Sequence, residues 1–315
     1  MPPEVDLSIR LTPTCTLSSP VLIASGSLGF ADTIEGAVDL EGAGAFITPT
    51  LTLLSRQGNP MPRTVEVSAG LIHANGLPNP GLSAFVQEDL PRLLSLPCPL
   101  IVSIHGESRE AWQALAGRLS AIQGIVGLEL NLTPTSLHSD GFRYGDVPNE
   151  AEALQYIAES LKSVRAVTSL PLIAKLPNIG AEIGAASRAA VEGGADVIAV
   201  SQAFPAVAIR LGGSQFRLPG VVGGLSGPAV KPLSLYQVWR VAQSVSVPII
   251  GTGGVMCGED ALEFLMAGAT AVGVGTANFI HPNASSQILL EIRAWMERSG
   301  VREVAALAGL ANKKG

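Results

Sequence analysis

The sequence contains few aromatic residues, four histidines and three cysteines. Aromatic residues account for 4% of the chain, so its core must be built from Ala, Val, Ile and Leu, a composition typical of a buried parallel sheet covered by helices. Cys15, Cys98 and Cys257 lack the spacing of metal ligands, and the histidines include no pair at such a spacing. These absences predict free thiols in a reducing compartment and no metal site.

Positive charge and long apolar runs are also scarce. The 315 residues carry a net charge of −6 and no basic stripe, which argues against nucleic acid as the main partner. No apolar run approaches the roughly 18 residues that span a bilayer. The N-terminal stretch MPPEVDLSIRLTPT alternates polar and apolar residues and contains acidic ones, unlike a signal or transit peptide. The sequence therefore predicts a soluble cytoplasmic protein without membrane contact.

Short apolar runs rich in β-branched residues alternate with longer amphipathic segments through most of the chain. The runs, each expected to form a buried strand, lie at 20–24, 45–48, 100–104, 126–131, 172–175, 197–200, 248–251 and 271–274. Helical patterns lie at 109–122, 150–167, 183–192, 235–244, 260–266 and 285–296. This alternation predicts an α/β fold, a single (β/α)8 TIM barrel.

Glycine-containing steps connect the expected helices to the strands that follow. Gly194 and Gly268 each precede alanine where a helical pattern gives way to an apolar run, and glycine readily takes the left-handed conformation that ends a helix. An open doubly wound sheet would need a Gly-rich turn after its first strand with an acidic partner downstream, and the segment 24–29 lacks that partner. Residues 52–98 and 202–233 do not fit the repeat and are expected to form lids and hairpins over one mouth of the barrel.

Two glycine-rich motifs end the last two expected strands. Residues 251–254 read Gly-Thr-Gly-Gly and residues 273–276 read Gly-Val-Gly-Thr. In a (β/α)8 barrel, ligands bind at the carboxyl ends of the strands, and the loops after strands 7 and 8 frequently form a phosphate site. Backbone N–H groups can approach phosphate oxygens closely where side chains are absent. The two motifs together predict a bound phosphate group.

Several longer motifs resemble one enzyme family. They are GGLSGPAVKP at 223–232, PIIGTGG at 248–254, EDALEF at 259–264 and AGATAVGVGTANF at 267–279, with shorter matches at 24–26, 58–60, 79–81, 129–131 and 175–176. The chain thereby resembles the class 1 dihydroorotate dehydrogenases over nearly its whole length, and is most similar to the subclass, 1B, that pairs with a separate iron–sulfur, FAD-bearing electron-transfer subunit. The resemblance implies a flavin mononucleotide (FMN) oxidoreductase of pyrimidine biosynthesis that acts on a CH–CH donor. It also implies a homodimer, and one FMN-binding barrel domain over residues 1–315.

The resemblance further implies which residues form the site. Those that would contact the flavin are Ser25, Thr50, Ser103, Asn131, Lys175, Val200, Gly227, Gly253, Gly254, Gly275 and Thr276. Those that would contact the substrate are His73, Asn131, Ser136, Ser201 and Gln202. Lys175 would act in catalysis by placing a positive charge beside the N1/C2 edge of the flavin, where negative charge collects on reduction. Asn131 would offer a donor and an acceptor together. An ordinary ion pair for Lys175 and a satisfied strand-end amide for Asn131 are the structural alternatives.

One loop departs from the family's pattern at the position of the catalytic base. The family reads Asn-x-Ser-Cys-Pro-Asn after strand 4, and its cysteine takes a proton from the substrate while hydride goes to flavin N5. Residues 131–136 here read Asn-Leu-Thr-Pro-Thr-Ser, so Pro134 stands at the base position. Proline has no titratable proton and cannot serve as the base. The replacement candidates on the same loop are Thr133, Thr135, Ser136 and His138.

Other substrate-side positions also change. Pro49 stands where the resemblance expects lysine, His73 and Ser103 where it expects asparagines, and Ser201-Gln202 where it expects Asn-Thr. Such coordinated changes favour a protein that still binds the flavin in the family's way but acts on a dihydroorotate-like or other small planar substrate. Genuine dihydroorotate oxidation with a replacement base, and a non-catalytic flavin- or phosphate-binding subunit, are the alternatives. His73 and His105 fall near this pocket, where either is an acid–base group suited to neutral pH or a loop histidine without a role.

Overall fold

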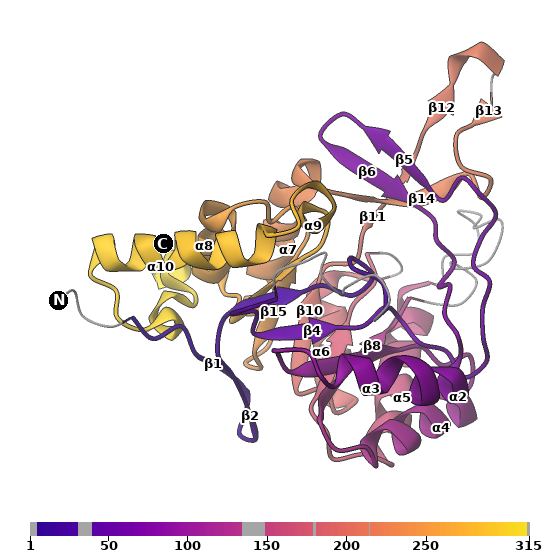
Figure 1. Cartoon of the computed structure of the whole chain (residues 1–315), viewed down its shortest axis with the longest axis horizontal. Coiled ribbons are helices and arrows are strands. Elements are labelled where there is room, and N and C mark those ends of the chain that lie inside the picture. Colours follow the sequence, from indigo (N-terminus) through magenta and orange to yellow (C-terminus); the bar gives the residue numbers. More distant parts are fainter. Residues whose placement is uncertain (1–4, 31–39, 134–148, 179–180, 214, 314–315) are drawn as a thin grey trace.

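A closed barrel of eight parallel strands forms the body of the protein (Figure 1). The computed structural model describes residues 5–30, 40–133, 149–178, 181–213 and 215–313. The barrel strands are β3 (Val21–Ile23), β4 (Ala45–Ile47), β7 (Leu100–Ile104), β8 (Ile125–Asn131), β9 (Leu172–Lys175), β10 (Val197–Val200), β15 (Ile249–Thr252) and β16 (Ala271–Val274). They pair in the order β10-β15-β16-β3-β4-β7-β8-β9. Because these are the expected strands, to within two residues at each end, the predicted (β/α)8 barrel is confirmed.

The strands form where they do because each is apolar and covered on both faces. Every residue of β3, β4, β7, β9, β10, β15 and β16 is buried. A strand with one face in solvent would alternate apolar and polar residues. A parallel strand that lies between the barrel interior and the helices is apolar throughout. The short uninterrupted apolar runs of the sequence therefore correspond to the barrel strands.

Helices connect the barrel strands on the outside. They include α4 (Arg109–Ser120), α5 (Glu150–Arg165), α6 (Ile183–Glu192), α7 (Lys231–Ala242), α8 (Gly258–Ala267), α9 (Ala277–Ile280) and α10 (Ala284–Ser299). Local sequence fixes their ends: Asn149 and Glu152 form a capping box at the start of α5, and Gly300 ends α10 at a φ of 69°. Helix α7 begins four residues earlier than the periodicity predicts, because Pro232 is accommodated in its first turn.

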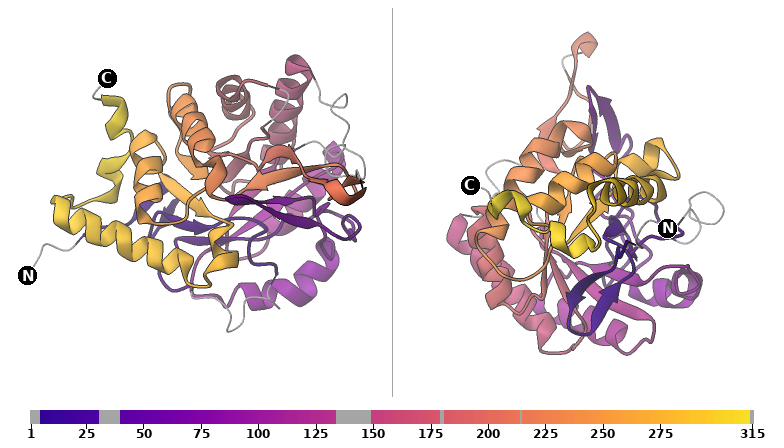
Figure 2. Two further views of the ribbon diagram at one scale, coloured as in Figure 1. Left: turned by 90° about the horizontal axis from the view of Figure 1, so that it is seen from above. Right: turned by 90° about the vertical axis from the view of Figure 1, so that its left-hand side faces the viewer.

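The two segments that do not fit the repeat build a small antiparallel sheet. It contains β5 (Thr64–Val67), β6 (Gly70–His73), β11 (Phe204–Val207) and β14 (Val222–Ser226), in the order β11-β14-β6-β5. This confirms the predicted hairpins and joins segments far apart in the sequence. A further hairpin, β12 (Ile209–Arg210) and β13 (Gln215–Phe216), projects from the body in Figure 1 and in the right-hand view of Figure 2.

Part of 52–98 is helical, which the sequence analysis did not predict. A continuous helical stretch runs through α2 (Leu82–Ala84), the π-helical turn η1 (Phe85–Asp89) and α3 (Leu90–Leu93). The remaining elements are the hairpin β1 (Ile9–Thr12) and β2 (Cys15–Leu17), and the 3-10 turns η4 (Leu211–Gly213), η5 (Pro228–Val230), η6 (Val304–Leu307) and η7 (Leu310–Lys313). Among the described residues, no helix has both the length and the apolar composition that crossing a membrane requires.

Candidate active site

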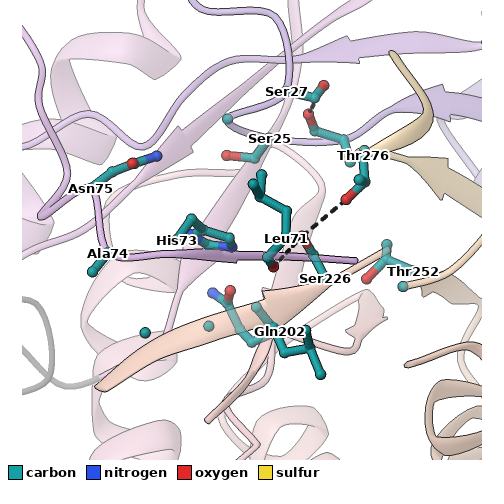
Figure 3. A pocket seen from close by; sticks show the side chains of 18 of the residues that line it. Ser25, Ser27, Leu71, His73, Ala74, Asn75, Gln202, Ser226, Thr252 and Thr276 are labelled. Atoms are coloured by element: carbon teal, nitrogen blue, oxygen red, sulfur yellow. Dashed lines mark hydrogen bonds between the residues drawn. The ribbon is translucent and has the colours of Figure 1, made fainter. Parts of the chain in front are cut away.

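A cavity of about 910 Å³ lies between the carboxyl ends of the barrel strands and the small antiparallel sheet. Residues at or just after the ends of β3, β4, β8, β9, β10, β15 and β16 line it from the barrel, and residues of β6 and β14 line it from the sheet. Figure 3 shows part of this lining, with Ser25 and Thr276 from the barrel and His73 and Leu71 from β6. The position is the one at which barrel enzymes bind their ligands.

A chain of polar side chains crosses the barrel side of the cavity. Thr50, after β4, lies 3.2 Å from Ser103 on β7 and accepts a hydrogen bond of 3.1 Å from Asn131 Nδ2. The Asn131 Oδ1 atom accepts bonds from Gln202 Nε2 at 2.9 Å and from the Thr133 N–H at 3.2 Å. Asn131 is thus oriented from both sides, with its amide flip assigned by these partners. The Asn131 side-chain amide has two N–H groups, and the Thr50 bond uses one of them.

The network gives a first prediction about stability. Thr50→Val keeps the shape of the side chain but leaves the buried Asn131 amide without its acceptor, so we expect the free energy of unfolding to fall by about 1–3 kcal/mol. Chemical denaturation would measure it. Thr133→Val is the matched control, because Thr133 joins the network through its backbone N–H. A Thr50→Val protein as stable as this control would show that the network does not hold Asn131.

Lys175, which lines the cavity, and Glu129, which does not, form a buried ion pair. Lys175 ends β9 in register with Asn131, and its Nζ atom lies 3.6 Å from Glu129 Oε1. Only 8% of Lys175 and 2% of Glu129 is exposed. Glu129 Oε1 has no hydrogen-bond partner in the described part of the chain, so Lys175 is what compensates its charge. The sequence analysis did not assign a role to Glu129, although an acid inside a buried apolar strand was the available signal.

The charged and titratable side chains of the cavity are all basic. Among its described lining residues these are Arg63, His73 and Lys175, and none is a carboxylate. Arg63 is held by the carbonyl oxygens of Asn59 and Gln57, each at 2.6 Å. Lys175 is paired with Glu129, which lies outside the lining, so Arg63 is the lining cation without an acid partner among the described residues, and its charge favours an anionic ligand. The family resemblance includes Arg63 on a substrate-side loop but assigned it no contact, because its place depends on how the loop before β5 folds.

The two histidines near the expected pocket have different surroundings. His73 lies on β6 opposite Gly224, where an added Cβ atom would approach the His73 ring to 3.4 Å. Burial, and then the charge of Lys175, lower the pKa of His73. His105 does not line the cavity: it is fully buried, its Nδ1 atom lies 2.9 Å from the Asn131 carbonyl oxygen, and its ring packs edge-on against Trp112. His105 therefore supports the end of β8, and His73 faces the ligand space.

The glycines at the ends of β15 and β16 serve two different purposes. Gly253 and Gly254 have φ angles of 102° and 88°, and an added Cβ atom would lie 2.4 Å from Ser234 Oγ or 2.7 Å from the Lys231 backbone. These two are required by the fold itself. At Gly275 an added Cβ would meet nothing nearer than Ala24 Cβ, at 3.9 Å, and would enter the cavity. Gly275 therefore keeps space open for a ligand.

Most of the residues expected at the site come together in this cavity. Those that line it are Ser25, Thr50, His73, Asn131, Thr133, Lys175, Ser201, Gln202, Gly227, Gly253, Gly254, Gly275 and Thr276. Ser103 and Val200 do not line it: both are fully buried on barrel strands, and Ser103 is linked to the cavity through Thr50. Pro134, Thr135, Ser136 and His138 lie outside the described residues.

Asn178 is a further lining residue that the sequence analysis missed. Its Nδ2 atom donates to the Gln202 carbonyl oxygen, and its buried Oδ1 atom has no hydrogen-bond partner in the part of the chain that the structure describes. A buried amide oxygen without a partner costs free energy unless a ligand or water donates to it. The sequence offered no signal for it beyond an Asn shortly after the strand that ends in Lys175.

Comparison with known proteins points to one family. The family model described as dihydroorotate dehydrogenase matches residues 11–296. A protein of Desulforudis audaxviator named dihydroorotate dehydrogenase B (NAD(+)), catalytic subunit, is 42% identical over 301 residues, which cover 95% of this chain and 96% of the relative. Proteins with the same name from Geotalea daltonii and Pelobacter propionicus are 41% and 42% identical over 305 residues each, covering 96% of this chain and 97% and 98% of the relatives.

Proposed function

This chain belongs to the dihydroorotate dehydrogenase family, and from that premise we propose that it is an FMN-dependent oxidoreductase that oxidises dihydroorotate to orotate. Residues 1–315 act as one FMN-binding domain in this proposal. The observation that carries it is the charge of the cavity: its described lining contains the cations Arg63 and Lys175 and no carboxylate, and Glu129, the partner of Lys175, lies outside the lining. Dihydroorotate is an anion with two amide edges, so such a lining suits it.

The residues around the cavity fit FMN. The open space above Gly275 suits a phosphate, and the backbone around Gly253, Gly254 and Thr276 would hold it beside the ends of β15 and β16. Lys175 and Asn131 would lie against the ring system, since both line the cavity and are paired on adjacent strands. When bound, FMN supplies a two-electron acceptor that takes hydride at N5.

The polar residues that line the cavity can each be assigned a role in binding or catalysis that fits their contacts. Lys175 keeps a positive charge where negative charge collects during the reaction, and Glu129 holds that charge in place from below. The amides of Asn131, Asn178 and Gln202 provide donors and acceptors for the amide edges of the substrate. Arg63, whose guanidinium is fixed by two carbonyl oxygens, provides a cation for the substrate carboxylate.

The electrons are proposed to leave through a partner. The relatives named above are catalytic subunits, and their name includes NAD(+). We therefore propose that this chain passes electrons to a separate iron–sulfur, FAD-bearing subunit that reduces NAD⁺, and that it is a homodimer.

A second candidate is an FMN oxidoreductase with a different small planar substrate. The observation that favours it is the set of His73 and Gln202 at positions where the resemblance expects asparagine and threonine. Identities of 41–42% over almost the whole chain support dihydroorotate ahead of this candidate.

Product analysis tests the function. The purified protein, with an artificial two-electron dye as acceptor, is expected to convert dihydroorotate to an equal amount of orotate as the dye is reduced. Heat denaturation should release FMN rather than FAD. Absence of orotate, together with dye reduction by another dihydropyrimidine, would replace dihydroorotate by the second candidate's substrate. Absence of any flavin would contradict both.

A further inference from the structure

His73 is the only described histidine that faces the ligand space. His105 is sealed behind β8, and His281 is exposed and does not line the cavity. The His73 ring enters from β6, on the side of the cavity formed by the small sheet, whereas Lys175 and Asn131 enter from the barrel. In Figure 3, His73 and Leu71 project from the same strand among the lining residues. A ligand that fills the space between the sheet and the barrel therefore meets the imidazole on one side and Lys175 on the other.

The imidazole is available for proton transfer. Its ring nitrogens make no hydrogen bond to another described residue, whereas His105 Nδ1 is close to a carbonyl oxygen. On the neighbouring strands, the residues opposite His73 are Thr64 and Gly224, which are not titratable. The charged lining residues, Arg63 and Lys175, are both cations. Such surroundings favour the neutral ring, which is the form that accepts a proton.

We propose that His73 is the catalytic base of this protein, and this rests on the proposed function. The imidazole accepts the proton from C5 of dihydroorotate. The electron pair of the C5–H bond becomes the new C5=C6 double bond, and hydride leaves C6 for FMN, which is the oxidant. The products are orotate and an imidazolium, whose proton passes to solvent before the next turnover. The negative charge of the substrate offsets the cost of a third cation in the cavity.

His73 has an advantage over the hydroxyl groups of the loop after β8. Thr133 is the described hydroxyl of that loop that lines the cavity, and a hydroxyl must itself lose a proton before it can take one. A neutral imidazole accepts a proton directly near neutral pH. The chain therefore carries a competent base on β6, although Pro134 stands where the family's base is expected.

The assignment predicts a particular pH dependence. The pKa of His73 lies below its usual value of 6.5, with burial as the main cause and Lys175 as the second. Because the neutral ring is the active form, reduction of the flavin by dihydroorotate should become independent of pH well above the lowered pKa. It should then fall about tenfold per pH unit below the lowered pKa.

Anaerobic stopped-flow measurement of flavin reduction tests the proposal, with wild type, His73→Gln, Thr133→Val and His281→Gln compared between pH 4.5 and 9. We expect His73→Gln to slow reduction by about 10²- to 10⁴-fold, the range that a general base contributes. We also expect that variant to lose the acid limb of the profile. The dissociation constant of orotate, read from the shift of the flavin spectrum, should change less than tenfold, because glutamine keeps a polar group at the position. His281→Gln controls for loss of a histidine outside the cavity.

A second readout does not depend on turnover. Nuclear magnetic resonance titration of histidine-labelled protein, with His73→Gln used to assign the signal, should show that His73 titrates below 6.5 and shifts when orotate binds. Reduction by His73→Gln within threefold of wild type would overturn the assignment. Equal loss of orotate affinity and reduction rate would also overturn it, since that result describes a binding residue. If wild type is not reduced by dihydroorotate at any pH, the proposed function itself fails, which is distinguishable from both of these results.

Discussion

Replacement of Lys175 by methionine is expected to lower the free energy of unfolding by about 3–5 kcal/mol, the usual cost of leaving one member of a buried ion pair without its partner. Glu129 is 2% exposed and its Oε1 atom has no hydrogen-bond partner in the described structure, so loss of Lys175 would leave a buried carboxylate without compensation. The same change should slow flavin reduction by about 10²- to 10³-fold, the effect of removing one preorganised group that stabilises developing charge.

A double variant separates the two effects. Lys175→Met with Glu129→Gln removes both charges, and replacing a whole buried pair is frequently neutral for stability. We therefore expect denaturation to show recovered stability while stopped-flow reduction stays slow. Glu129→Gln alone keeps the cation and should reduce the flavin within tenfold of wild type. Recovery of the reduction rate in the double variant would contradict the role of Lys175 as a cation at the flavin.

Replacement of Gly275 by valine is expected to weaken FMN binding by at least about 100-fold while leaving the apoprotein as stable as wild type. An added Cβ atom would meet only Ala24 Cβ, at 3.9 Å, and the left-handed region is not required at this residue, so the fold itself does not demand glycine here. The occupied space lies in the cavity at the end of β16, where it would displace the phosphate. Loss of one or two charge-assisted hydrogen bonds, at about 1.5–3 kcal/mol each, accounts for the factor.

Fluorescence titration of the apoprotein with FMN measures this prediction. Gly275→Ala is the matched variant, with a smaller side chain and a smaller expected loss of affinity. Gly253→Val is a poorer test, because its Cβ atom would lie 2.4 Å from Ser234 Oγ at a φ of 102°, so that weak binding would not be separable from misfolding. Unchanged FMN affinity in Gly275→Val would place the phosphate elsewhere.

The sequence predicted the barrel well because its strands are short apolar runs that need no information from distant residues. It predicted the small sheet only as hairpins, since the pairing of Gly224 with His73 joins residues far apart in the chain. The helical stretch 82–93 was missed: Gly81 and Pro91 flank or interrupt it, and its middle is a π-helical turn without the usual period.

The site could be predicted where residues end barrel strands. Asn131, Lys175 and Gly275 follow from strand ends and the family resemblance, and all three line the cavity. Arg63 and Asn178 could not be assigned because their positions depend on irregular loops. Ser103 was expected at the flavin, but it is fully buried before the end of β7 and is linked to the cavity through Thr50.

The roles proposed for the residues of this cavity all require that dihydroorotate reduces a flavin held in it. The direct measurement is an anaerobic absorbance spectrum of the purified protein before and after addition of dihydroorotate. We predict a flavin band at about 450 nm that bleaches within one turnover and returns when oxygen or a dye is admitted. A band that persists through prolonged incubation with dihydroorotate would contradict the account.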